Sequence, residues 1–164
     1  MLKSYSGNCH CGDIRFTVEA DLDERKAICR CSRCTMLGFL HHHVQRSNFK
    51  LLTDPTLITE YRFNTLHAVH TFCKRCGVQP YYTSRSDPDL LDINLRCLQG
   101  IDIYELDYEL SDGRSWEDYQ AVRKERERVA QVTQVPYRVT KWRILWKNPF
   151  LTFSSDEAFE SSWK

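Results

Sequence analysis

The sequence predicts a mainly β domain, and three observations carry that prediction. Residues 13–20 alternate apolar and polar side chains, as in a strand with one buried face. Further short segments of similar character follow, and turn-forming pairs such as Asp54-Pro55 and Asp87-Pro88 separate them. No long helical patterns alternate with these segments, which favours an all-β or β-rich fold over a β-α-β arrangement.

Four further regions are expected to contain strands: residues 39–52, 57–63, 78–83 and 91–97. Pro80 lacks a backbone N–H, so it would confine the strand over 78–83 to the edge of a sheet.

One helix is expected in the C-terminal half. Ser115 and Asp118 form a Ser-x-x-Asp capping pattern, apolar and aromatic residues then recur at helical spacing, and Pro136 ends any continuation. The 164 residues are enough for one domain with its own core, expected over residues 5–128. Residues 129–164 are expected to form an aromatic-rich C-terminal extension.

Charge and hydropathy exclude several kinds of partner. The chain has 23 Lys and Arg residues against 22 Asp and Glu, and this balance gives no electrostatic reason to expect a nucleic acid. No apolar run approaches the roughly 18 residues that a membrane span needs. Residues 1–8 contain no apolar stretch of the kind found in secretory signals, so we expect a cytoplasmic protein.

Eight cysteines are the unusual feature of the composition. Seven of them fall into three tight groups, and such groups favour a metal ion, which gathers several thiolates around one point, over a disulfide framework. The groups are Cys9 and Cys11; Cys29, Cys31 and Cys34; and Cys73 and Cys76.

The first and third groups resemble each other, because a glycine follows each pair. Cys73 and Cys76 precede Gly77, as in zinc knuckles, and Cys9 and Cys11 precede Gly12. In a straight strand two such cysteines would be about 6.5 Å apart, whereas zinc holds two sulfurs about 3.8 Å apart. The chain must therefore bend there, and glycine permits the bend. The two pairs could form one closed four-cysteine site, although spacing alone leaves other pairings open.

The middle group offers three thiolates within six residues. Three thiolates and Zn²⁺ sum to a charge of −1, which suits an incoming thiolate better than the generation of hydroxide. Arg30 and Arg33 lie beside this group and could offset its charge or attract an anionic ligand.

Several alternatives stay open at this stage. The middle group could be closed by a fourth ligand, with His10, His70 and Cys97 as candidates. His41 and His43 share one face of a strand and are expected to be exposed or partly buried side chains rather than ligands. Cys97 is expected to be a small core residue.

The three cysteine groups and the residues around them resemble the family of glutathione-dependent formaldehyde-activating enzymes and centromere protein V. The resemblance is closer to the centromere protein V branch, through Tyr61-Arg62-Phe63-Asn64-Thr65, Arg85-Ser86-Asp87-Pro88 and Asn94-Leu95-Arg96-Cys97-Leu98. The family motifs are Gly7-Asn8-Cys9-His10-Cys11-Gly12 with Arg15-Phe16, Cys29-Arg30-Cys31-Ser32-Arg33-Cys34, and Phe72-Cys73-Lys74-Arg75-Cys76-Gly77.

The resemblance implies several short coiled β-sheets, a β-tent-like fold, around two zinc ions per chain. It implies a structural zinc on Cys9, Cys11, Cys73 and Cys76, and a catalytic-type zinc on Cys29, Cys31 and Cys34. Because a three-thiolate site with an open position binds metal more weakly than a closed site, we expect the second zinc to be only partly occupied. It also implies a carbon–sulfur lyase that joins glutathione and formaldehyde into S-hydroxymethylglutathione, with no catalytic residue beyond the second zinc site.

The sequence thus leads to two hypotheses. The first is a zinc-dependent carbon–sulfur lyase that acts on a small thiol adduct, such as glutathione with formaldehyde, with Arg30 and Arg33 as candidates for binding substrate carboxylates. The alternative is a zinc-stabilised binding module without catalytic activity. A fourth protein ligand on the second metal would favour the alternative.

Overall fold

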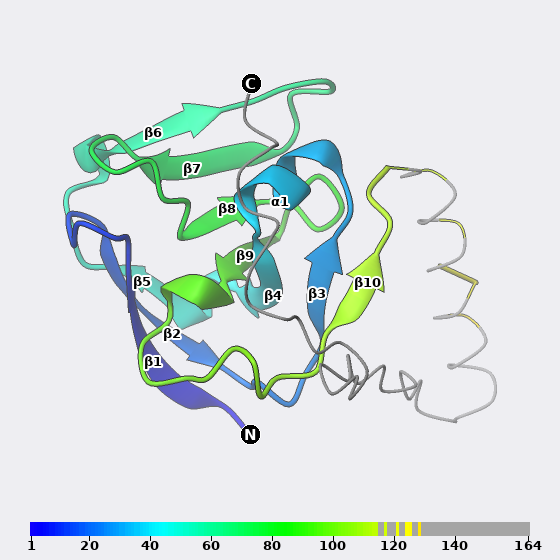
Figure 1. Cartoon of the computed structure of the whole chain (residues 1–164), viewed down its shortest axis with the longest axis horizontal. Coiled ribbons are helices and arrows are strands. Elements are labelled where there is room, and N and C mark those ends of the chain that lie inside the picture. The colour runs from blue at the N-terminus through cyan, green and yellow to red at the C-terminus, as the bar shows by residue number, and fades with distance from the viewer. Residues whose placement is uncertain (115–116, 118–120, 122–123, 126–127, 129–164) are drawn as a thin grey trace, which may run out of the picture.

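Two β-sheets form the computed structural model of this chain, which describes residues 1–114, 117, 121, 124, 125 and 128 (Figure 1). The prediction of a mainly β fold is confirmed. No helix among these described residues is long and apolar enough to cross a membrane.

The smaller sheet has three antiparallel strands in the order β1-β2-β5. They are β1 (Lys3–Asn8), β2 (Arg15–Ala20) and β5 (Phe49–Leu51). The alternation predicted for residues 13–20 is present in β2, where Phe16, Val18 and Ala20 are buried.

The larger sheet has seven strands in the order β10-β3-β4-β9-β8-β7-β6, and only the β10–β3 pair is parallel. One short helix, α1 (Ser32–Leu37), follows β3 directly and contacts it. The strands are β3 (Lys26–Cys29), β4 (Leu40–Gln45), β6 (Ile58–Tyr61), β7 (Val69–Cys73), β8 (Tyr81–Thr83), β9 (Leu90–Asn94) and β10 (Glu109–Ser111), with 3₁₀ turns at Arg46–Asn48, Pro55–Leu57 and Leu95–Cys97.

The edge position predicted for the strand near Pro80 is wrong. β8 begins at Tyr81 and pairs with both β7 and β9, so it is an interior strand. Pro80 immediately precedes it, where its missing N–H costs no ladder bond, and its carbonyl accepts a hydrogen bond of 2.9 Å from the Asn94 N–H.

The helix expected from Ser115 falls mostly outside the described residues, as do Ser115 and Trp116 themselves. The described residues in this region are helical: Glu117, Ala121, Lys124, Glu125 and Arg128. The expected extension over 129–164 also lies outside the described residues.

Strand alternation divides the larger sheet into an apolar face and a polar face. Leu40 and Val44 of β4 and Leu91 and Ile93 of β9 join the main core with Phe16 of the smaller sheet. Because successive side chains point to opposite faces, His41 and His43 of β4 and Asp92 of β9 face the other way.

Gly7 provides a test of the packing between β1 and β2. Its Cα pairs with Phe16, whose ring is fully buried, and a Cβ on Gly7 would overlap that ring. We therefore predict that Gly7→Ala lowers the free energy of unfolding by about 2 kcal/mol through overpacking. Ser6→Ala, at the exposed neighbouring position, is the control and should change it by less than about 0.5 kcal/mol. Urea unfolding of the three proteins measures both, and equal stabilities for Gly7→Ala and wild type would contradict this packing.

Candidate metal centres

Two cysteine pairs that are far apart in the sequence meet at the first cluster: Cys9 with Cys11, and Cys73 with Cys76. Their sulfur atoms all lie within 4.8 Å of one another. The Sγ atoms of Cys9 and Cys11 are 3.6 Å apart, as are those of Cys11 and Cys73. These separations are close to the roughly 3.8 Å between two sulfurs on a tetrahedral zinc ion. All eight cysteines of the chain lie within the described residues and are free thiols.

Two glycine turns create this cluster. Gly12 and Gly77 both have positive φ, 82° and 73°, a conformation that glycine adopts without strain. In the first turn the Gly12 N–H donates to the Cys9 carbonyl, and the Ile14 N–H donates to Cys9 Sγ at 3.3 Å. In the second, the Gly77 N–H donates to the Cys73 carbonyl at 2.9 Å. The bends expected from the sequence are thus present at both pairs.

The closeness of the four thiols opposes the ionisation of all of them together. A backbone hydrogen bond from Asp13 lowers the pKa of Cys11, but burial and hydrogen bonds with the three other cysteines raise it to about 12. For Cys76, burial raises the pKa, whereas backbone hydrogen bonds from Cys11 and Val78 contribute to lowering it to about 6. Four neighbouring thiolates therefore require a cation, which is what a zinc ion provides.

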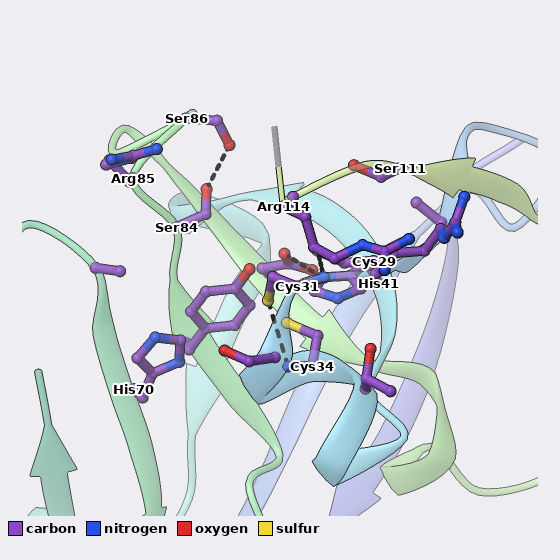
Figure 2. Close-up of a pocket in the computed structure, with 18 of the residues that line it drawn as sticks. Cys29, Cys31, Cys34, His41, His70, Ser84, Arg85, Ser86, Ser111 and Arg114 are labelled. Carbon is purple, nitrogen blue, oxygen red and sulfur yellow. Dashed lines mark hydrogen bonds and ion pairs between the residues drawn. The ribbon is translucent and has the colours of Figure 1, made fainter. Parts of the chain in front are cut away.

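The second cluster consists of Cys29, Cys31, Cys34 and His41. The ligand atoms of Cys29, Cys34 and His41 lie within 4.8 Å of one another. Cys31 connects Cys29 and Cys34, since its N–H donates to Cys29 Sγ at 3.5 Å and its own Sγ accepts from the Cys34 N–H at 3.4 Å. Figure 2 shows these side chains grouped where α1 begins.

A short helix brings the middle cysteines together. Cys31 is the N-cap of α1, and Cys34 lies one turn further on. Gly38 ends the helix in the left-handed conformation, with φ of 60°. The chain then enters β4, where His41 is the second residue. Sequence analysis missed this helix, because six residues are too few for a helical period to be recognised.

His41 is buried, with 7% of its surface exposed, which corrects the expectation of an exposed or partly buried side chain. The physical reason is that β4 is an interior strand, flanked by β3 and β9, and that the rings of Phe39 and Tyr82 pack against His41. The Nδ1 atom of His41 lies 2.8 Å from Oδ2 of Asp92. Its Nε2 atom is buried and has no hydrogen-bond partner among the described residues.

Asp92 is fully buried and also contacts His43, whose Nε2 atom lies 3.3 Å from the same carboxylate oxygen. Burial by itself would raise the pKa of Asp92, but the electrostatic effect of His41 and hydrogen bonds with His41 and His43 outweigh it and hold the pKa well below its usual range. Asp92 is therefore an ionised hydrogen-bond acceptor for both histidines.

The pairing register continues this polar face across the sheet. His43 pairs with Asp92, Asp92 with Tyr82, and Tyr82 with His70, so that one row of side chains crosses β4, β9, β8 and β7. The rings of Tyr82 and His70 stack with centroids 4.9 Å apart and an interplanar angle of 8°. Burial, and then the charge of Arg33, lowers the pKa of His70 to about 4, which keeps its imidazole neutral near pH 7.

A cavity of about 690 Å³ lies over this face. All four residues of the second cluster line it, together with His70 and Tyr82. Ser84, Arg85 and Ser86 form a rim on the side away from Cys29 (Figure 2).

The two arginines singled out in the sequence have different surroundings. Arg30 is exposed and lines the cavity. Arg33 points elsewhere: its Nη2 atom donates to Gln79 Oε1 at 2.9 Å, and its guanidinium lies 4.8 Å from the centre of the Tyr61 ring.

The other candidates for a fourth ligand do not join the second cluster. Cys97 is buried in the main core, as expected, and its Sγ faces the Gln79 carbonyl at 4.0 Å. His10 is exposed and lines a different cavity, one beside the first cluster. His70 lines the cavity over the second cluster, but the compact group of ligand atoms there contains His41 instead.

Sequence reasoning missed Asp92 and Gly113 altogether. Asp92 becomes relevant only through strand pairing across about fifty residues. At Gly113 a Cβ would lie 2.6 Å from Cys29 Sγ, so only glycine fits beside the cluster. The one available signal concerned His41, since the alternation of His41 and His43 already placed both on one strand face.

The fold and its two clusters define a mainly β protein with two cysteine-rich candidate metal sites. Residues 4–110 match the family model described as glutathione-dependent formaldehyde-activating enzyme. Since the match spans more than half of the chain, the protein belongs to that family. A crystal structure of a Rhodobacter sphaeroides protein is similar, with 28% identity and a TM-score of 0.60, over 64% of this chain and 97% of that one.

Substitution of one cysteine at a time distinguishes a metal ligand of the first cluster from a cysteine of the main core. We predict that Cys76→Ser lowers the zinc content by about one ion per chain and the free energy of unfolding by about 3 kcal/mol or more, because metal binding contributes to folding. Cys97→Ala, which changes a buried cysteine outside both clusters, should retain the zinc and lose only about 1 kcal/mol. Metal analysis and thermal unfolding provide the two measurements. Similar zinc contents and melting temperatures in both variants would rule out a structural metal at the first cluster.

Proposed function

We propose that this chain binds two zinc ions and is a carbon–sulfur lyase-type enzyme that acts on a small thiol adduct. Glutathione with formaldehyde, or a related pair of thiol and aldehyde, is the proposed substrate. The family description supports this substrate class. The observation that carries the proposal is the cavity, which lies directly over the second cluster and is lined by all four of its residues.

The residues of both clusters fit zinc. In the first cluster, Cys9, Cys11, Cys73 and Cys76 supply four thiols at the spacing of a closed structural site. In the second, the ligand atoms of Cys29, Cys34 and His41 lie within 4.8 Å of one another, and the buried Nε2 atom of His41 has no hydrogen-bond partner among the described residues. Sulfur and imidazole donors are the preferred ligands of zinc.

Zinc bound at the second cluster would supply the acidity that lowers the pKa of a substrate thiol. The chain itself would supply binding and orientation. Arg30 at the cavity edge can pair with a substrate carboxylate, and Arg114, which also lines the cavity and is exposed, can do the same. Arg33, also a candidate from the sequence, would act indirectly by holding Gln79 beside His70.

Two aromatic rings in the cavity wall, His70 and Tyr82, are uncharged near pH 7. His70 stays neutral because of its lowered pKa. Burial raises the pKa of Tyr82 well above its ordinary value, so this phenol stays protonated. These two rings thus add no charge to the cavity, and the orientation of an anionic substrate falls to the arginines that line it, Arg30 and Arg114.

A zinc-stabilised binding module is the second candidate. Its support is that Cys31 lies beside the three grouped ligands Cys29, Cys34 and His41, and four such ligands are the number that a closed structural site needs. Within the family, we further propose the centromere protein V branch, on the stretches Tyr61-Arg62-Phe63-Asn64-Thr65 and Arg85-Ser86-Asp87-Pro88. A cytoplasmic location remains part of the proposal.

Exchange spectroscopy tests the enzyme directly. We predict that zinc-loaded wild type accelerates the exchange between formaldehyde and S-hydroxymethylglutathione, measured by proton NMR, and that Cys29→Ser, which removes a ligand of the second cluster, reduces the acceleration at least tenfold. Cys97→Ala, remote from the cavity, is the control and should resemble wild type. If a fully zinc-loaded wild type accelerates exchange with neither glutathione nor any other small thiol, the binding module is the better account.

A further inference from the structure

We infer that His41 is a ligand of the second metal through its Nε2 atom, and that Asp92 is the positioning residue that fixes the orientation and tautomer of that imidazole. This inference rests on the proposal that the second cluster binds zinc. It assigns a role to two residues that the three-cysteine hypothesis leaves out.

The first step is the geometry of the donors. His41 contributes to the compact group with Cys29 and Cys34, in which all ligand atoms lie within 4.8 Å. Since Nδ1 is held by Asp92 at 2.8 Å, the nitrogen left for a metal is Nε2.

The second step is the burial of Nε2. A buried polar atom almost always has a hydrogen-bond partner, because desolvation without one is costly. The Nε2 atom of His41 has no such partner among the described residues. Its ring packs against that of Phe39, with centroids 4.6 Å apart. A metal ion bound to Nε2 resolves this exception.

The third step is the role of Asp92. Its carboxylate accepts a hydrogen bond from the protonated Nδ1 atom of His41, which leaves the lone pair on Nε2 and so selects the tautomer that binds a metal through Nε2. Asp92 is fully buried, and His43 contacts the same oxygen from the next position on that strand face. A carboxylate that holds the distal nitrogen of a metal-bound histidine is a recurrent feature of zinc sites.

The assignment changes the charge of the centre. Two thiolates balance the two positive charges of zinc, and a neutral imidazole adds none, whereas three thiolates leave a net charge of −1. With His41 in place of a third thiolate, the centre would be the stronger Lewis acid. Cys31 then remains at the helix N-cap, beside the metal site and half-buried at the cavity.

Metal titration of three variants tests this inference without an activity assay. We compare His41→Gln, Asp92→Asn and, as control, His42→Gln, which replaces a neighbouring buried histidine whose Nδ1 faces the Arg25 carbonyl. Zinc affinity is measured by competition with a chromophoric chelator, and the site is examined by the visible spectrum of the Co²⁺-loaded protein. Circular dichroism verifies the fold of each variant.

We expect His41→Gln to weaken the second zinc at least a hundredfold and to change the Co²⁺ spectrum, while the first zinc stays bound. Asp92→Asn should weaken the second zinc about ten- to a hundredfold. His42→Gln should stay within threefold of wild type. If His41→Gln binds two zinc ions with wild-type affinity and spectrum, the inference is overturned while the proposed function stands. If wild type itself binds only one zinc ion, both fail. Should His41→Gln not fold, an unchanged second-site affinity in Asp92→Asn would overturn the role of Asp92.

Discussion

The convergence of Cys9 and Cys11 with Cys73 and Cys76 joins the smaller sheet to β7 of the larger one, in addition to the main core that both sheets share. The first pair follows β1 of the smaller sheet, whereas Cys73 is the last residue of β7 in the larger sheet and Cys76 lies in the turn after it. Their sulfurs join segments 62 residues apart in the sequence. A small apolar group with Ile14 surrounds them, but it is separate from the main core. A metal ion on four mutually repelling thiolates would supply the attraction that this small group lacks.

The second cluster depends on a different constraint, the alternation of side chains along interior strands. In β4, Leu40 and Val44 enter the core, so His41 and His43 must face the opposite side, where Asp92 lies. The polar residues of the candidate site therefore lie on the opposite face of the same strands, β4 and β9, that contribute to the core. Cys31 and Cys34 come instead from a short helix, and the cavity lies where these two supports meet (Figure 2).

Much of this organisation could be predicted from the sequence, and the limits have physical causes. The paired cysteines and their glycines are local signals, and the mainly β class follows from local alternation. The interior position of β8 could not be predicted, because it depends on pairing with β7 and β9 and because Pro80 indicated an edge strand. For His41, the pattern gave the correct strand face but not its burial, which requires β3 and β9 as neighbours. Asp92 carries no local signal at all, since its role comes from a cross-strand contact.

Anomalous diffraction at the zinc absorption edge, from crystals of the whole chain, tests the central claim that two cysteine-rich centres bind zinc. This account predicts two peaks per chain. One would lie among the sulfurs of Cys9, Cys11, Cys73 and Cys76, and the other within bonding distance of Cys29, Cys34 and the Nε2 atom of His41. A zinc-loaded crystal with no peak at the first cluster, or with a second peak remote from Cys29 and Cys34, would contradict it.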